Sequence, residues 1–294
     1  MNDSLPPRPP FGQPSDAASP LRTESDAGPA ADAKWVGADD PFPFSCQPTP
    51  ACTRKCCRGA ILLTPYDVLR LRTRLAMKSA DFLREYAQIG VDKKFPVPSL
   101  FLRPDDAGVC RFLGERGCTV YSDRPWACRL YPLGFAVSKD PASGQGEQRY
   151  FLLPRPEGCS NVDPPTQTVR QWLDTQETEA YERWGSQFKE LVLHQSMKPE
   201  NSSPMKTEMW FTACYDLDQF REFVFGSTLL QRFEVDDDLI EEMRYDDETL
   251  MRFALQWLRF SVFGERTMQP RTGAVEDYIT RTSKKTQPPA PPPE

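Results

Sequence analysis

The chain has 294 residues with a formal net charge of −6 at pH 7, so it can form one large domain or two ordinary ones. The net negative charge argues against electrostatic binding of nucleic acid over a broad surface, because such binding needs clustered Lys and Arg. The longest apolar stretch, 253–263, is interrupted by polar residues and is too short to cross a bilayer. The N-terminus does not read as a secretory signal. We therefore expect a cytoplasmic protein, in which thiols stay reduced.

Composition divides the chain into four predicted parts. Residues 1–40 and 271–294 are rich in Pro and polar residues and are predicted to be disordered tails. Residues 41–165 hold eight of the nine cysteines with many Gly and Pro, whereas residues 166–270 have apolar residues at helical spacing. The expected fold is α+β: a small cysteine-rich module with short strands and two helices, followed by a mainly α-helical region that packs on or beside it.

In the cysteine-rich part, two helix starts are expected. Thr64 can cap a helix in which Pro65 takes the first position and Asp67 lies in the first turn. A second helix is predicted to start at Ser79 and to stop at Gly90. From residue 100 the sequence consists of short apolar runs. Turn signals at 105–108 and 114–117 separate these runs and predict short strands between 100 and 121. Further strands are predicted at 133–137 and 150–153.

In the helical part, the apolar residues between Val169 and Val192 predict one long helix over 166–195. Asp216, Asp236 and either Asp246 or Asp247 are predicted caps of three further helices. The aromatic residues of these helices are expected to form a core.

The strongest signal is the clustering of cysteines. Zinc and iron–sulfur clusters are bound by deprotonated thiolates that converge from short loops, and close spacing lets one loop supply several ligands. In a reducing compartment this pattern favours metal binding over disulfides or unliganded thiols. The candidate metal ligands are Cys46, Cys52, Cys56, Cys57, Cys110, Cys118, Cys128 and Cys159. They could supply one or two four-thiolate sites, and the spacing does not say which cysteines share a metal.

Three other residue patterns narrow the chemistry. The single histidine, His194, lies outside the cluster, so the site is expected to be all-thiolate or thiolate plus carboxylate. Cys56 and Cys57 are adjacent, and neighbouring side chains usually diverge, so both are not expected on one ion. Cys214 stands apart and is expected to be a small core residue.

Two blocks resemble the YkgJ-type cysteine-cluster proteins, a family described as zinc- or iron-chelating. The blocks are FSCQPTPACTRKCCRGAILLTPYDVLRL and CRFLGERGCTVYSDRPWACRLYPLGF, within residues 42–160. The family usually separates its first two cysteines by two residues, whereas five separate Cys46 from Cys52, so the resemblance supports Cys46 least. The stretch WFTACYDLDQFREFVF also looks like longer bacterial members.

The resemblance implies binding of zinc or an iron–sulfur cluster. In its motif, Arg124 and Arg129 flank Cys128, and we expect both to lie behind the ligands, donating hydrogen bonds to metal-bound sulfur or pairing with nearby carboxylates. A flagellin lysine N-methylase carries a related cysteine cluster, so an enzymatic role stays open.

Three hypotheses of function follow. The first is a metal-binding protein whose partner is the metal ion or cluster itself. The second is an iron–sulfur enzyme acting in electron transfer or protein modification. The third is an interaction scaffold in which zinc holds the fold of the cysteine module together. The sequence has no phosphate-binding, dinucleotide-binding or serine-hydrolase motif.

Overall fold

The computed structural model describes residues 33–46, 55–90, 99–139, 146–154, 159, 164–197 and 203–272. Cys52 and most of both predicted tails lie outside these residues. The chain forms two compact units, and the boundary between them in the sequence lies between Thr207 and Glu208. Each unit is described by itself. This division does not test the predicted domain limits near residues 40, 165 and 270, which remain predictions.

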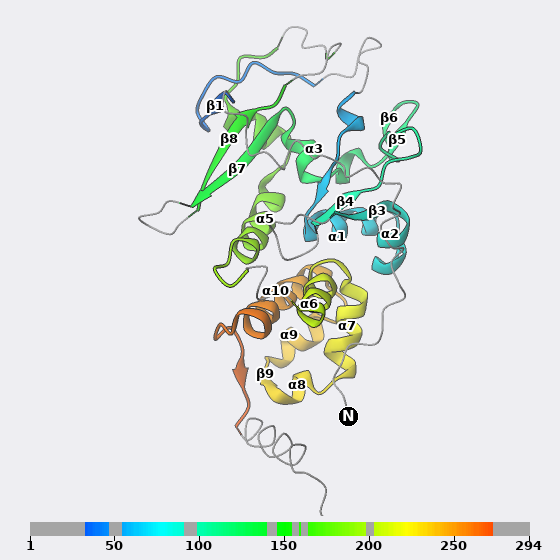
Figure 1. Ribbon diagram of the computed structural model, residues 1–294, viewed down its shortest axis with the longest axis vertical. Helices are drawn as coiled ribbons and strands as arrows, with labels where there is room; N and C mark the ends of the chain where they lie inside the picture. The colour runs from blue at the N-terminus through cyan, green and yellow to red at the C-terminus, as the bar shows by residue number, and fades with distance from the viewer. Residues whose placement is uncertain are drawn as a thin grey trace, which may run out of the picture. The chain divides into compact units, whose positions relative to one another are not determined.

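The first unit combines helices with small antiparallel sheets, so the predicted α+β fold is confirmed (Figure 1). One sheet has the order β1 (Trp35–Val36), β8 (Gly146–Leu152) and β7 (Leu133–Lys139). A second has the order β2 (Leu62–Leu63), β4 (Ser99–Leu102) and β3 (Ala87–Gly90), and a short hairpin pairs β5 (Leu113–Gly114) with β6 (Gly117–Cys118). The helices are α1 (Pro65–Arg74), α2 (Ser79–Tyr86), α3 (Trp126–Leu130), α4 (Val169–Thr175) and α5 (Glu179–Val192), with 3-10 turns at Lys55–Arg58 and Tyr121–Asp123.

The predicted start of α1 is confirmed by a capping box. The Thr64 hydroxyl accepts from the Asp67 N–H, and the Asp67 carboxylate accepts from the Thr64 N–H. The predicted stop of the next helix at Gly90 is wrong. Helix α2 ends at Tyr86 because Ala87 turns to an extended conformation and pairs with Leu102 of β4.

The prediction of one helix over 166–195 is also wrong. The chain breaks between α4 and α5 at Glu177, which has a left-handed φ of 53°. Contacts from outside the predicted helix and from its own side chains stabilise the break. Arg129 donates to the carbonyl of Gln176 at 2.7 Å, and the hydroxyl of Thr178 donates to the carbonyl of Leu173 at 3.3 Å. This turn contains no Gly or Pro, so the helix propensities of its residues do not predict the break.

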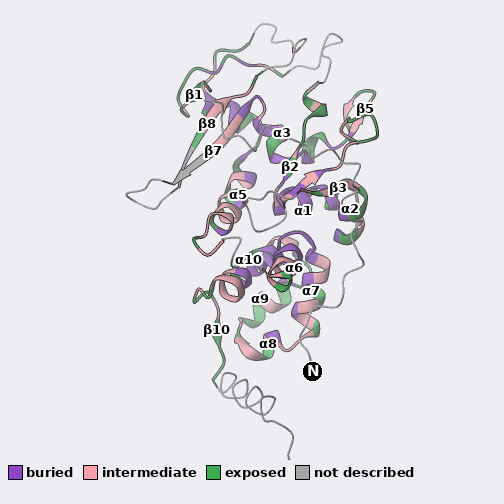
Figure 2. Cartoon of the chain, viewed as in Figure 1, coloured by how far each residue is buried: buried purple, intermediate pink, exposed green. Residues whose placement is uncertain are grey.

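The second unit is helical. It contains most of α6 (Pro204–Tyr215), then α7 (Leu217–Gly226), α8 (Leu229–Arg232), α9 (Asp237–Glu242) and α10 (Asp247–Phe263), with β9 (Phe233–Glu234) paired to β10 (Gln269–Pro270). The caps are confirmed: Asp216, Asp236 and Asp246 accept backbone N–H groups at the starts of α7, α9 and α10. Much of α10 is buried, as Figure 2 shows. Aromatic residues such as Phe220 and Trp257 pack in this core, and Cys214 is buried there as expected.

One buried carboxylate joins two helices of the first unit. Asp67, which has no exposed surface, accepts from the Thr64 N–H through Oδ2 at 2.7 Å. Its Oδ1 accepts from the Trp126 N–H, also at 2.7 Å. Since Trp126 is the first residue of α3, Asp67 satisfies backbone donors at the starts of both α1 and α3. This contact fixes α3, and with it Cys128, relative to α1.

We predict that Asp67→Asn destabilises the fold by about 2 kcal/mol. The amide has one acceptor oxygen, so its NH₂ group must face one of the two buried N–H donors and leave it unsatisfied. Urea unfolding of the purified variant measures the change. Asp81→Asn, which removes an exposed ion pair with Arg84 on α2, is the control and should change stability by less than about 0.5 kcal/mol. Equal losses in the two variants would contradict the role of Asp67.

Candidate metal centre

Four structural segments bring cysteines together in the first unit. Cys57 lies in the 3-10 turn Lys55–Arg58, and its carbonyl accepts from the Cys110 N–H at 2.7 Å. Three residues after Cys110, the chain enters the hairpin in which Cys118 pairs with Leu113. Cys128 lies in α3, which Asp67 holds in place. Backbone contacts therefore gather segments that are far apart in the sequence.

The thiols of these segments influence one another electrostatically. Burial raises the pKa of Cys128, and the neighbouring charges of Cys110 and Cys118 raise it further. Burial likewise raises the pKa of Cys110, and the charges of Cys118 and Asp105 add to the effect. The thiol of Cys57 is also affected by Cys110 and Cys128. The thiols of Cys110 and Cys118 thus oppose ionisation of Cys128, and those of Cys110 and Cys128 oppose ionisation of Cys57. A cation beside these thiols would favour their thiolate forms.

Cys56 and Cys57 form a hydrogen-bonded pair. The Cys57 thiol donates to the Cys56 sulfur, which lowers the pKa of Cys56 to about 6, and the same bond raises the pKa of Cys57. Cys56 is exposed, whereas Cys57 is half-buried. The two adjacent residues thus occupy different environments: Cys57 is coupled to the other cysteines, and Cys56 is the more acidic and accessible thiol.

The donor set, which consists of cysteine thiols, fits a thiophilic metal. Within the described ranges, no group of three Cys, His, Asp or Glu side chains is close enough to hold an ion as it stands. Cys46 is exposed and Cys159 is half-buried, and the structure does not test whether they are ligands. Cys52 lies outside the described residues. Soft thiolates select zinc, copper(I) or iron–sulfur clusters, so the chemistry of the donors agrees with the sequence prediction.

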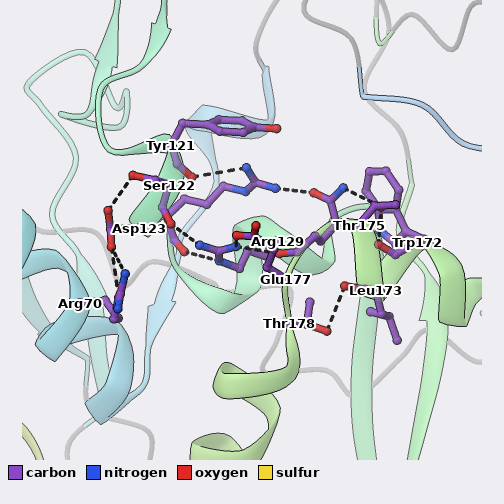
Figure 3. A network of polar contacts seen from close by, with 12 residues as sticks. Arg70, Tyr121, Ser122, Asp123, Arg129, Trp172, Leu173, Thr175, Glu177 and Thr178 are labelled. Atoms are coloured by element: carbon purple, nitrogen blue, oxygen red, sulfur yellow. Dashed lines mark hydrogen bonds and ion pairs between the residues drawn. The ribbon is translucent and has the colours of Figure 1, made fainter. Parts of the chain in front are cut away.

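Two arginines flank Cys128, and Figure 3 shows the surroundings of one of them, Arg129. Arg129 is 4% exposed and donates to the carbonyls of Ser122, Arg124 and Gln176, and its guanidinium lies 4.4 Å from the ring centre of Tyr181. Its donors are thus engaged with backbone oxygens. Arg124 lies 3.9 Å from the ring centre of Tyr121, and its charge favours the thiolates of Cys118 and Cys128. The expected role of both residues behind the ligands remains a prediction.

Sequence reasoning missed two residues of this region. Asp67 was predicted only as a first-turn residue of α1, and its bond to Trp126 spans 59 positions. Gln176 was assigned to the interior of a helix, yet it accepts hydrogen bonds from Arg124 and Arg129. No local pattern could have revealed either long-range contact.

Comparison with known proteins identifies the segment that carries the site. Residues 45–160 match the family model CxxCxxCC, described as "Putative zinc- or iron-chelating domain". No curated protein and no solved structure matches the chain. In the described part of the chain, no helix combines the length and apolar character required to span a bilayer.

We predict that Cys56 is the first thiol to be alkylated in the metal-free chain at pH 7. Its pKa of about 6 leaves it mostly as thiolate, and the labelling rate should rise with pH through about 6 and then level off. Cys57→Ala removes the hydrogen-bond donor and should slow labelling of Cys56 by about tenfold. Mass spectrometry of peptides after brief iodoacetamide treatment measures the order.

Cys214→Ala is the control for this experiment, because Cys214 is buried in the other unit and its removal should leave the Cys56 rate unchanged. Faster labelling of Cys128 than of Cys56 would contradict the assigned environments.

Proposed function

We propose that this chain is a metal-binding protein that holds zinc or iron, as an ion or as an iron–sulfur cluster, through cysteine thiolates. The observation that carries the proposal is that backbone contacts gather the segments that hold Cys57, Cys110, Cys118 and Cys128, with the Cys110 N–H donating to the Cys57 carbonyl at 2.7 Å. Apolar packing alone would not require several ionisable thiols in one partly buried place, because neighbouring thiols raise each other's pKa, as Cys110 and Cys118 do for Cys128. A bound cation removes that conflict.

The proposed ligands have distinct roles. Cys128 and Cys57 approach from α3 and from the 3-10 turn, and Cys110 and Cys118 come from the strand region between them. Cys56 is the accessible thiolate at the edge, suited to be the first group that meets an incoming metal. Cys46, Cys52 and Cys159 are further candidate ligands. A bound metal would supply positive charge to the thiolates, and an iron–sulfur cluster would also supply a redox centre.

The direct test is metal analysis of the protein purified without oxygen. We expect zinc or iron in at least stoichiometric amount, and the two metals give different signatures. Zinc leaves the protein colourless, whereas an iron–sulfur cluster gives acid-labile sulfide and a visible absorbance that dithionite bleaches. A protein that contains neither metal, fails to bind added zinc or iron, and has fully reactive thiols would overturn the proposal.

We predict that Cys128→Ser weakens zinc binding by at least about a hundredfold, because a thiolate ligand is replaced by a hydroxyl that stays protonated. Competition with a chromogenic chelator measures the dissociation constant. Cys214→Ser is the matched control, since it makes the same chemical change in the other unit. Equal affinity of the Cys128→Ser variant and the unmodified chain would show that Cys128 is not a ligand.

A further inference from the structure

Gln176 lies outside the matched segment 45–160, yet it accepts hydrogen bonds from both arginines that flank Cys128. Its side-chain Oε1 accepts from Nη2 of Arg124, and its backbone carbonyl accepts from Nη1 of Arg129 at 2.7 Å. These contacts join α3 and the segment before it to the turn between α4 and α5. The arginines of the cysteine domain are therefore anchored by a residue beyond it.

The contact with Gln176 fixes the orientation of Arg124. The guanidinium is stacked over Tyr121, and its bond to the Tyr121 carbonyl is long, at 3.4 Å. Stacking allows the guanidinium to slide over the ring, whereas a hydrogen bond to an amide oxygen fixes its direction. Arg124 is 8% exposed, so solvent screens its charge weakly. The Arg124 carbonyl accepts from Nε of Arg129 at 3.2 Å, and Arg129 lies next to Cys128 in α3.

Gln176 is itself held in a defined turn. Its N–H donates to the carbonyls of Trp172 and Leu173, and the next residue, Glu177, takes the left-handed conformation that ends the helical path. Thr178 then donates to Leu173 and to Glu182 through its hydroxyl. The acceptor that Arg124 meets is thus preorganised before any metal binds.

We propose that Gln176 is a positioning residue of the metal centre, which holds the two arginines that flank Cys128 and so keeps α3 and its cysteine in place. The inference rests on the proposed function and extends it: the metal-binding unit includes the turn between α4 and α5 as well as the cysteine domain. Four thiolates on one Zn²⁺ leave a net charge of −2, and partners behind the ligands typically change metal affinity by about 10- to 100-fold.

The test compares zinc affinity in the full-length chain, with Zn²⁺ alone as the probe. Gln176→Leu keeps the approximate size of the side chain and removes the acceptor, and we expect about tenfold weaker zinc binding. Arg170→Gln is the matched control on the neighbouring helix α4, where it removes an exposed ion pair with Asp39. It should bind zinc as the unmodified chain does. Melting of the metal-free proteins shows whether each variant is folded.

A double-mutant cycle separates positioning from a general loss of structure. Arg124→Gln should weaken zinc binding, and adding Gln176→Leu to it should cause little further loss, because both changes remove the same interaction. If Gln176→Leu lowers the melting temperature of the metal-free chain, Gln176→Asn replaces it, because its amide is one methylene too short to reach Arg124.

The outcomes distinguish this inference from the function on which it rests. Unchanged zinc affinity in Gln176→Leu, or fully additive losses in the double variant, would overturn the positioning role while leaving the metal site intact. An unmodified chain that binds neither zinc nor iron would instead refute the proposed function.

Discussion

The buried carboxylate of Asp67 is the contact on which the arrangement of the cysteine domain depends. One oxygen completes the capping box of α1, and the other accepts the first N–H of α3. Burial raises the pKa of this carboxyl to about 6, while the N–H donors and the charge of Arg129 favour the ionised form. Because the Thr64 N–H and the first N–H of α3 both donate to it, Asp67 fixes the position of Cys128 relative to α1.

The second constraint is charge. Neighbouring thiols raise the pKa of Cys57 and of Cys128, and the charge of Arg124 partly offsets this effect at Cys128. Arg124 acts directly on two of the thiols, whereas Arg129 is engaged with three backbone carbonyls and the ring of Tyr181. We therefore propose that the paired arginines of one motif have different roles: Arg129 stabilises the chain around Cys128, and Arg124 balances charge. A bound metal would supply the larger part of that balance.

The sequence predicted features that depend on neighbouring residues. The Thr64 cap, the Asp caps of the second unit and the strands at 133–137 and 150–153 all follow from local pattern, and the family match over 45–160 agrees with the two cysteine blocks. The failures have a common cause. The stop at Gly90 and the helix over 166–195 were overridden by strand pairing at Ala87 and by Arg129 at the carbonyl of Gln176. Such contacts join residues that are distant in the chain, and periodicity carries no information about them.

The most direct test of a thiolate centre built around Cys128 is X-ray absorption at the zinc or iron edge of the metal-loaded, full-length protein. The account predicts a first shell of sulfur at about 2.3 Å. The Cys128→Ser variant should lose part of that shell. A first shell made mainly of nitrogen or oxygen would contradict the account, because it would place the metal away from the thiols that α3 and Asp67 bring together.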